Sequence, residues 1–170
     1  GWNAIVRRWH PGSLHGTETV DYVYIENSEK VMDKQIIEIQ NVHKPVGYSH
    51  AIRTGELIFV AGQVALDPEG NLVGLGDIVA QTEQVYHNLG LILENAGSSL
   101  SDLVKLTVFL TRVEDLQPYR YMRDRLRPEP PPASTLLVVT ALARPEFLIE
   151  VEAVAMVAKT HPAKSENLTG

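Results

Sequence analysis

The most regular alternation of apolar and polar residues lies in residues 147–157, FLIEVEAVAMV. Successive side chains of a β-strand point to opposite faces, so every second residue shares a face. One face of this predicted strand is wholly apolar, formed by Ile149, Val151, Ala153, Ala155 and Val157. The other face is apolar at both ends but carries Glu150 and Glu152 in its middle. Two carboxylates on such a face require charged partners, solvent or a chemical role.

Short apolar segments elsewhere predict further strands. They span residues 20–25, 35–40, 57–66, 103–111 and 134–142. In the segment 103–111, one continuous apolar face is expected from Val104, Leu106, Val108 and Leu110. Gly62 lies inside the segment 57–66, where a glycine indicates a bulge or a close approach to the backbone. Residues 67–71, DPEGN, then predict a tight turn, after which residues 72–74 could return as a hairpin arm.

Two segments repeat apolar residues at helical spacing. Asp77 opens the first, whose apolar face is Ile78, Val85, Leu89, Ile92 and Ala96. Gly97 follows at the point where the end of a helix favours a left-handed residue. In the second, residues 113–126, Asp115 is the predicted N-cap, and Pro118 lies in the first turn, where its missing N–H is tolerated. The shared face of this helix is Leu116, Tyr119, Met122 and Leu126.

The predicted order, β-β-(β)-α-β-α-β-β, indicates an α+β domain with a mixed β-sheet and two helices on one face. Residues 35–157 form this domain, between an N-terminal extension, residues 1–34, and a polar tail, residues 158–170. Met32 is a candidate original start; the alternative for the residues before it is an ordinary extra edge strand. Several strands are apolar on both faces, whereas two helices cover one face. We therefore expect oligomerisation to bury the other face.

Composition narrows the classes of function. The chain has 170 residues, 44% of them hydrophobic, which fits one domain with a real core. The absence of cysteine excludes disulfides, zinc–thiolate sites and cysteine nucleophiles, and the six histidines show no metal-ligand spacing. A net charge of −6 argues against nucleic acid as a partner, and no apolar run approaches the ~18–20 residues of a membrane span. Because residues 1–16 lack the apolar core of a signal peptide, we expect a cytoplasmic protein.

Four stretches of the chain form a recognisable set: GYSHAI with LIFVAGQVALDPEGNLVG, QTEQVYHNLGLILENAGSSLSDLVKLTVFLT, PPASTLLVVTAL and IEVEAVA. Through them, residues 35–157 resemble the Rid (YjgF/L-PSP) family of reactive-intermediate deaminases. The resemblance implies a chorismate-mutase-like fold and a homotrimer, whose sheets line a central barrel with three clefts at the subunit interfaces. It also implies that these clefts hydrolyse imines and enamines released by pyridoxal-phosphate enzymes. The products are a keto acid and ammonia, and no cofactor is used.

The resemblance assigns roles to single residues as well. Glu150 matches the glutamate that orients water in the family, and Tyr48 matches a tyrosine of the cleft. Gly62 and Gln63 match the cleft segment Ser-Gly-Gln, in which Ala61 replaces the serine. We therefore take Glu150 and Tyr48 as candidate catalytic residues, and Gly62 and Gln63 as candidate substrate-binding residues.

One family motif is altered. In the motif Pro-Ala-Arg-Ser, the arginine clamps the carboxylate of a 2-imino acid, but this chain has Ser134 there, followed by Thr135. A serine hydroxyl cannot supply a charge-assisted clamp. The chain is thus similar to subfamilies that lack the carboxylate-binding arginine. Ser134 and Thr135 stay candidate substrate-binding residues, and backbone N–H groups near Ser134 or Gly62 could receive an oxyanion or a carboxylate.

Imine hydrolysis needs water delivered to an electrophilic carbon and a proton transferred to the leaving nitrogen. Glu150 could orient and partly deprotonate that water and then return the proton. Its apolar neighbours and the like charge of Glu152, ~6.6–6.8 Å away on an ideal strand, should both raise its pKa. Tyr48 could hydrogen-bond the substrate. His50, expected on the same strand face as Tyr48, could bind the substrate and shuttle protons.

Each of these residues has a structural alternative. The two glutamates could pair with cations across a trimer interface or face a solvated central channel. Tyr48 could be a packed aromatic with a satisfied hydroxyl, and His50 an ordinary core or surface group.

Three functions follow from this reading. The first is cofactor-free hydrolysis of a reactive imine, enamine or related metabolite. The second is a non-catalytic trimer that binds a small carboxylate metabolite. The third, an endoribonuclease or translation inhibitor, is the weakest, because the chain is acidic and Asp124 interrupts its basic run, residues 120–127.

Overall fold

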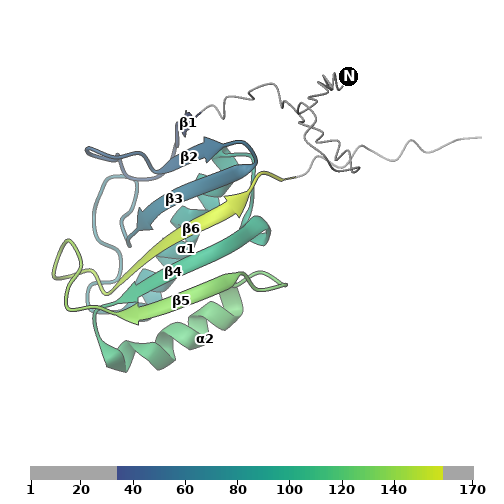
Figure 1. Ribbon diagram of the computed structural model, residues 1–170. Helices are drawn as coiled ribbons and strands as arrows, with labels where there is room; N and C mark the ends of the chain where they lie inside the picture. The colour runs from purple at the N-terminus through teal and green to yellow at the C-terminus, as the bar shows by residue number, and fades with distance from the viewer. Residues whose placement is uncertain (1–33, 159–170) are drawn as a thin grey trace, which may run out of the picture. The chain divides into compact units, whose positions relative to one another are not determined.

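A computed structural model describes residues 34–158 of the chain (Figure 1). Its six strands and two α-helices are β1 (Lys34–Ile37), β2 (Ala51–Thr54), β3 (Leu57–Gln63), α1 (Ile78–Asn95), β4 (Leu103–Leu110), α2 (Leu116–Leu126), β5 (Ala133–Val138) and β6 (Ile149–Met156). The strand expected at residues 20–25, and Met32 as a candidate start, lie outside the described residues.

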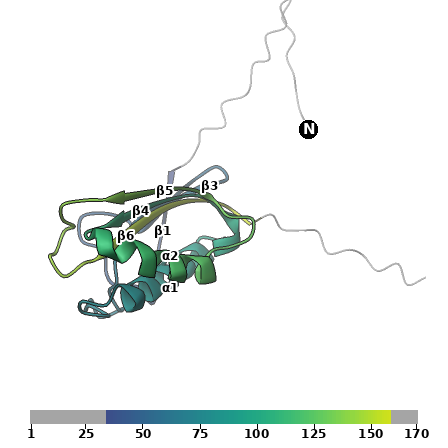
Figure 2. The same ribbon diagram turned by 90° about the horizontal axis from the view of Figure 1, so that it is seen from below.

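The strands form one mixed sheet in the order β1-β2-β3-β6-β4-β5. All neighbours are antiparallel except β4 and β5, which are parallel and joined through α2. Both helices pack on the same face of this sheet (Figure 2). The predicted α+β architecture, with two helices on one face, is confirmed. Within residues 34–158, neither helix combines the length and the apolar character needed to cross a membrane.

The core lies between the helices and the sheet. The apolar face predicted for β6 is buried there, since Ile149, Val151, Ala153 and Ala155 are all at most 5% exposed. From α1 the core takes Val85, Leu89, Ile92 and Leu93, and from α2 it takes Tyr119 and Met122. Burial on this scale is the main source of stability for a helix packed on a sheet.

The ends of α1 are set by local chemistry. The side chain of Asp77 accepts hydrogen bonds from the backbone N–H groups of Val79 at 2.9 Å and Ala80 at 3.2 Å, as an N-cap does. Gly97 has a φ of +74°, the left-handed conformation predicted for the residue after the helix.

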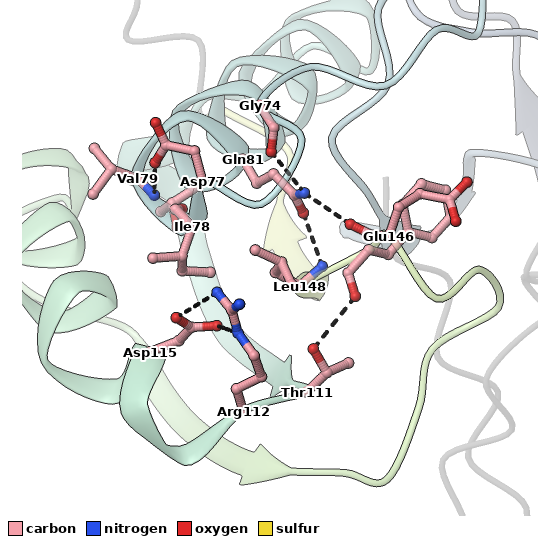
Figure 3. A network of polar contacts seen from close by, with 12 residues as sticks. Gly74, Asp77, Ile78, Val79, Gln81, Thr111, Arg112, Asp115, Glu146 and Leu148 are labelled. Atoms are coloured by element: carbon pink, nitrogen blue, oxygen red, sulfur yellow. Dashed lines mark hydrogen bonds and ion pairs between the residues drawn. The ribbon is translucent and has the colours of Figure 1, made fainter.

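Asp115 precedes α2 as expected, but its side chain caps nothing. It is buried and accepts hydrogen bonds from Arg112 at 2.7 and 2.9 Å instead (Figure 3).

Two predicted strand features were wrong, and one strand was missed. β2 had not been predicted. Of residues 72–74, only Leu72 pairs, in an isolated bridge with Leu66, so these residues do not form a hairpin arm. Val104 does not join the buried face of β4. The pairing of β4 with β6 shifts by one residue between Leu103 and Lys105, so Val104 is the extra residue of a bulge and is 44% exposed.

The face of the sheet opposite the helices, the open face, carries apolar side chains in cross-strand register. Ile36, Ile52, Phe59 and Val154 lie opposite one another across β1, β2, β3 and β6. Ile36 is 60% exposed and Phe59 is 45% exposed. Leu57, paired with Met156, extends the same surface.

Candidate active site

The candidate site is built around a bulge in β3. Val60 pairs with Ala153 and Gln63 pairs with Val151, so Ala61 and Gly62 together oppose the single residue Glu152. Gly62 is also in close contact with the carboxylate of Glu150. A Cβ atom added to Gly62 would overlap Oε1 of Glu150 and would lie 2.7 Å from its Cδ. The sequence prediction of a bulge or close approach at Gly62 is confirmed in both senses.

Glu150 and Gly62 line a cavity of about 470 Å³. Both residues belong to the end of the sheet where β3 ends and β2 and β6 begin, an end that can be followed on the ribbon in Figure 1. Three segments form its wall: the loop before β2, the end of β3 with the residues after it, and the loop leading into β6. Their lining residues are His43, Lys44, Val46, Tyr48, Ala61, Gly62, Val64, Leu66, Ala143, Arg144, Phe147 and Glu150. The cavity therefore combines an apolar wall with a few polar groups, as sites for small molecules usually do.

Buried amide side chains hold one of these segments, the end of β3 with the residues after it. Nδ2 of Asn88, on α1, donates to the backbone oxygens of Val64 at 3.2 Å and Leu66 at 2.9 Å. Nε2 of Gln63 donates to the backbone oxygen of Ala61 at 2.9 Å, inside the bulge. Both amides are at most 1% exposed, so the backbone beside the cavity is fixed from the core side.

Tyr48 reaches the cavity at the end of a chain of rings. Its hydroxyl lies 3.1 Å from Nε2 of His43, and the ring of His50 packs edge-on against both neighbouring rings. Nε2 of His50 lies 2.7 Å from the backbone oxygen of His43. A carbonyl oxygen only accepts, so this Nε2 carries the proton and Nδ1 accepts from Gln63 at 3.3 Å. Both nitrogens of His50 are thus engaged in holding His43 and Gln63.

Three of the titratable groups that line the cavity have shifted pKa values. Burial and, secondarily, the charge of Glu152 raise the pKa of Glu150, as predicted from the sequence. Burial and then the charge of Glu150 raise the pKa of Tyr48, so its hydroxyl keeps its proton at neutral pH. Burial, followed by His50 and Arg144, lowers the pKa of His43, which is therefore a neutral imidazole. The result is a basic carboxylate beside a neutral hydrogen-bonded phenol.

The structure brings together three of the seven candidate site residues: Glu150, Tyr48 and Gly62. Gln63 and His50 lie behind the cavity wall, where both are buried. The expectation that His50 shares a strand face with Tyr48 was wrong, because β2 begins only at Ala51, after both residues.

Ser134 and Thr135 are exposed on β5 and do not line the cavity. The hydroxyl of Thr135 accepts a hydrogen bond from Nζ of Lys105 at 2.9 Å. β5 lies at one edge of the sheet, with β6 and β4 between it and the bulge of β3.

Sequence reasoning missed the other polar members of the cavity, His43, Lys44 and Arg144. Each lies in a loop without apolar periodicity, so no strand or helix pattern singled it out. The signals available were local: a His-Lys pair before Pro45, and an arginine directly before Pro145 in the loop that leads to Glu150. Across residues 34–158, no three His, Asp or Glu side chains gather as metal ligands would.

Comparison with known proteins gives the family. A profile described as Endoribonuclease L-PSP matches residues 38–157. A RutC family protein of Pyrococcus abyssi is 42% identical over 125 residues, covering 73% of this chain and 98% of that protein. The chain belongs to the YjgF/L-PSP (Rid) family. All residues that line the cavity fall inside the matched region.

Two further Rid relatives bear on structure and function. The crystal structure of RidA from an Antarctic Psychrobacter species is 34% identical with a TM-score of 0.68, covering 72% of this chain and 99% of that one. The chloroplastic Reactive Intermediate Deaminase A of Arabidopsis thaliana is 31% identical over 129 residues, covering 75% of this chain and 68% of that protein. Rid family membership supports the fold and, in general terms, a Rid-type deaminase or hydrolase function.

Proposed function

We propose that this Rid family member hydrolyses reactive imines or enamines in the cavity that contains Glu150 and Tyr48, without a cofactor. One observation carries the proposal: the Glu150 carboxylate rests against Gly62 in a largely apolar cavity, with the Tyr48 hydroxyl in the same wall. A carboxylate with a raised pKa is a stronger base than an ordinary glutamate, which favours its taking a proton from water and returning it later.

The proposed reaction balances with water alone. Glu150 takes a proton from water while the oxygen adds to the imine carbon, and the electron pair of the C=N bond moves to nitrogen. Glu150 returns this proton to the nitrogen, which gives the carbinolamine. Glu150 then takes the hydroxyl proton of the carbinolamine and passes it to the same nitrogen as the C–N bond breaks, so that the carbonyl forms and ammonia leaves. Tyr48, held by His43, hydrogen-bonds the reacting centre and stays protonated throughout.

We propose a homotrimer in which the open faces line a central barrel and the cavities open at the subunit interfaces. The apolar row of Ile36, Ile52, Phe59 and Val154, exposed at Ile36 and Phe59 and half-buried at the other two, supports it, because an apolar face of this kind marks an interface. In such an assembly Ser134 and Thr135 would complete a site from the neighbouring protomer. Light scattering should give a mass near three times 18.8 kDa; a monomer at micromolar concentration would refute the assembly.

An imine-trapping assay tests the activity. An amino-acid oxidase generates 2-imino acids in solution, and semicarbazide traps those that survive. The wild-type protein should lower the amount of trapped imine, and Glu150→Gln should abolish this effect. Failure of the wild-type protein to shorten the lifetime of any imine in the series would refute the deaminase proposal.

One sequence feature favours a second candidate, a non-catalytic trimer that binds small carboxylates. By its resemblance to the family motif, Ser134 stands where other members have the clamping arginine. A protein without that clamp could still bind a small acid while failing to orient an imine for hydrolysis. Calorimetry and the trapping assay together decide between the two candidates. Binding of small acids without any change in the imine lifetime would support the non-catalytic binding protein. RNA cleavage, which the name of the family profile suggests, remains the weakest candidate at a net charge of −6.

A further inference from the structure

Arg144 starts a tight turn in the wall of the cavity. The backbone N–H of Phe147 donates to the backbone oxygen of Arg144 at 3.1 Å, which closes a four-residue turn with Pro145 in its second position. Proline fixes φ near the value that this position requires. The guanidinium lies over the ring of Phe147, 5.3 Å from the ring centroid. The backbone and the aromatic ring together restrict where Arg144 can reach.

The side-chain amide of Gln81 helps to anchor the segment that follows Arg144 to the core, together with Thr111 (Figure 3). Nε2 of Gln81, a fully buried residue of α1, donates to the backbone oxygens of Glu146 at 2.9 Å and Gly74 at 3.0 Å. Its Oε1 accepts from the backbone N–H of Leu148 at 2.8 Å. The backbone that follows Arg144 is therefore preorganised, so binding at this loop orders little of the main chain.

The positive charge of Arg144 has no carboxylate partner within residues 34–158. Arg112, Arg123 and Arg127 each form an ion pair, but no ion pair in this part of the chain includes Arg144, although Glu150 lines the same cavity. An uncompensated guanidinium in a cavity wall is suited to bind a carboxylate through paired N–H donors. Lys44 is the other cation of the wall. Both side chains are exposed, but the lysine is a point charge without the paired donors of a guanidinium.

The structure assigns to Arg144 the binding of the substrate's carboxylate: we propose that it is the specificity-determining residue of this cavity. It would supply from the loop before β6 the cation that Ser134 does not supply from β5. The identity of the reacting group rests on the proposed function, whereas the anion site does not. The preferred ligand is a small aliphatic imino acid or keto acid, whose carbon chain contacts the apolar wall formed by Val64, Leu66 and Phe147.

A binding experiment tests this without turnover. The probes are 2-oxobutyrate, a keto acid of the expected class, and its uncharged methyl ester, titrated calorimetrically into the full chain. We expect the wild-type protein to prefer the acid. Arg144→Gln should weaken binding of 2-oxobutyrate roughly 10- to 100-fold, the range for a lost charge-assisted hydrogen bond, and should leave binding of the ester unchanged. Arg144→Lys keeps the charge but not the paired donors, so its affinity for 2-oxobutyrate should lie between those of the wild-type protein and Arg144→Gln.

Two controls separate a binding role from a structural one. Arg120→Gln removes the same charge from an exposed position on α2 outside the cavity and should change nothing. Lys44→Gln should have a smaller effect than Arg144→Gln. Melting temperatures report whether each variant folds, and if Arg144→Gln does not, Arg144→Lys and the comparison of acid with ester decide.

The outcomes distinguish this inference from the deaminase proposal. Binding of 2-oxobutyrate that depends on Arg144, without imine hydrolysis, supports the anion site and refutes the enzyme. Imine hydrolysis in which Arg144→Gln changes neither the KM for anionic imines nor the affinity for 2-oxobutyrate refutes the anion site alone. Equal affinity of the wild-type protein for acid and ester, or no binding of the acid, also overturns it.

Discussion

Glu150 and Glu152 lie two residues apart on β6 and point to the same face of the sheet, yet their surroundings differ. Glu150 pairs across the sheet with Phe109, rests against Gly62 and lines the 470 Å³ cavity. Glu152 pairs with Thr107, is exposed, and lines a separate hollow of about 340 Å³ on the open face with Lys105. Two glutamates on the same face of one strand therefore differ in burial and in the groups around them.

The difference comes from the neighbouring strand. The bulge of β3 gives two residues opposite Glu152, and the second of them, Gly62, leaves room for the carboxylate of Glu150. Glu150 is consequently removed from solvent far enough for its pKa to rise. The candidate base is thus defined by the backbone of β3 as much as by the glutamate itself.

The largest expected effect is a difference in activity between the two glutamates. Glu150→Gln should lower imine hydrolysis by about 10²- to 10⁴-fold, the usual contribution of a general base, because an amide cannot accept the proton of water. Glu152→Gln should keep activity within about threefold, since Glu152 lies outside the cavity. Semicarbazide trapping measures both. Equal losses would mean that the two carboxylates act as one unit, despite their different surroundings.

The fold could be predicted wherever the signal was local. The N-cap at Asp77, the left-handed Gly97 and the two faces of β6 each depend on a residue and its immediate neighbours. β2 was missed because it is only four residues long and half polar, so that its place depends on pairing with β3. Val104 was assigned to the wrong face because its place also depends on pairing: a bulge exists only relative to the partner strand, here β6.

The residues of the candidate site also differ in whether a local signal marks them in the sequence. Glu150 and Gly62 could be singled out, because one is a charge in an apolar strand and the other a glycine inside a strand. His43 and Arg144 could not, because two loops near opposite ends of the domain sequence bring them to the cavity. Periodicity carries no information about which loops meet. The motif resemblance that pointed to Ser134 likewise says nothing about the distance from β5 to the cavity.

The next effect in size concerns Gly62. In Gly62→Ala the new methyl group would overlap Oε1 of Glu150, so the carboxylate must swing away. A misplacement of about 1 Å can cost around 10²-fold in rate, and we expect a loss of that order. The free energy of unfolding should fall by less than about 1 kcal/mol, because the overlapping atoms end a flexible side chain.

Gly90→Ala is the matched control for this substitution. At Gly90, on α1, the nearest atom to an added Cβ is Cδ1 of Leu100 at 3.9 Å, an ordinary contact. This variant should gain about 0.5–1 kcal/mol in unfolding free energy, as alanine replaces glycine in a helix, and should keep full activity. Full activity in Gly62→Ala would show that the position of the Glu150 carboxylate does not matter.

A smaller effect should appear in the pH profile. The base must be ionised to accept a proton, so kcat/KM should fall on the acidic side, as Glu150 becomes protonated. Because the negative charge of Glu152 contributes to raising the pKa of Glu150, Glu152→Gln should move this acidic limb to lower pH while leaving the plateau rate nearly unchanged. An acidic limb that does not move, measured at low ionic strength, would mean that solvent screens the two charges from each other.

The smallest effect is on stability. The pKa of Glu150 is raised in the folded protein, so the folded state holds this proton more tightly than the unfolded state does. The associated stabilisation is present below the ordinary glutamate value of 4.5 and is lost as the pH rises through the folded pKa. At neutral pH the ionised carboxylate is therefore a cost that Glu150→Gln removes. Denaturant unfolding at fixed protein concentration should find the variant more stable than wild type at neutral pH, by no more than about 0.5 kcal/mol, with the difference vanishing near pH 4. A variant that is less stable than wild type at neutral pH would mean that Glu150 is held by a cation in the assembled protein, and so has a structural role.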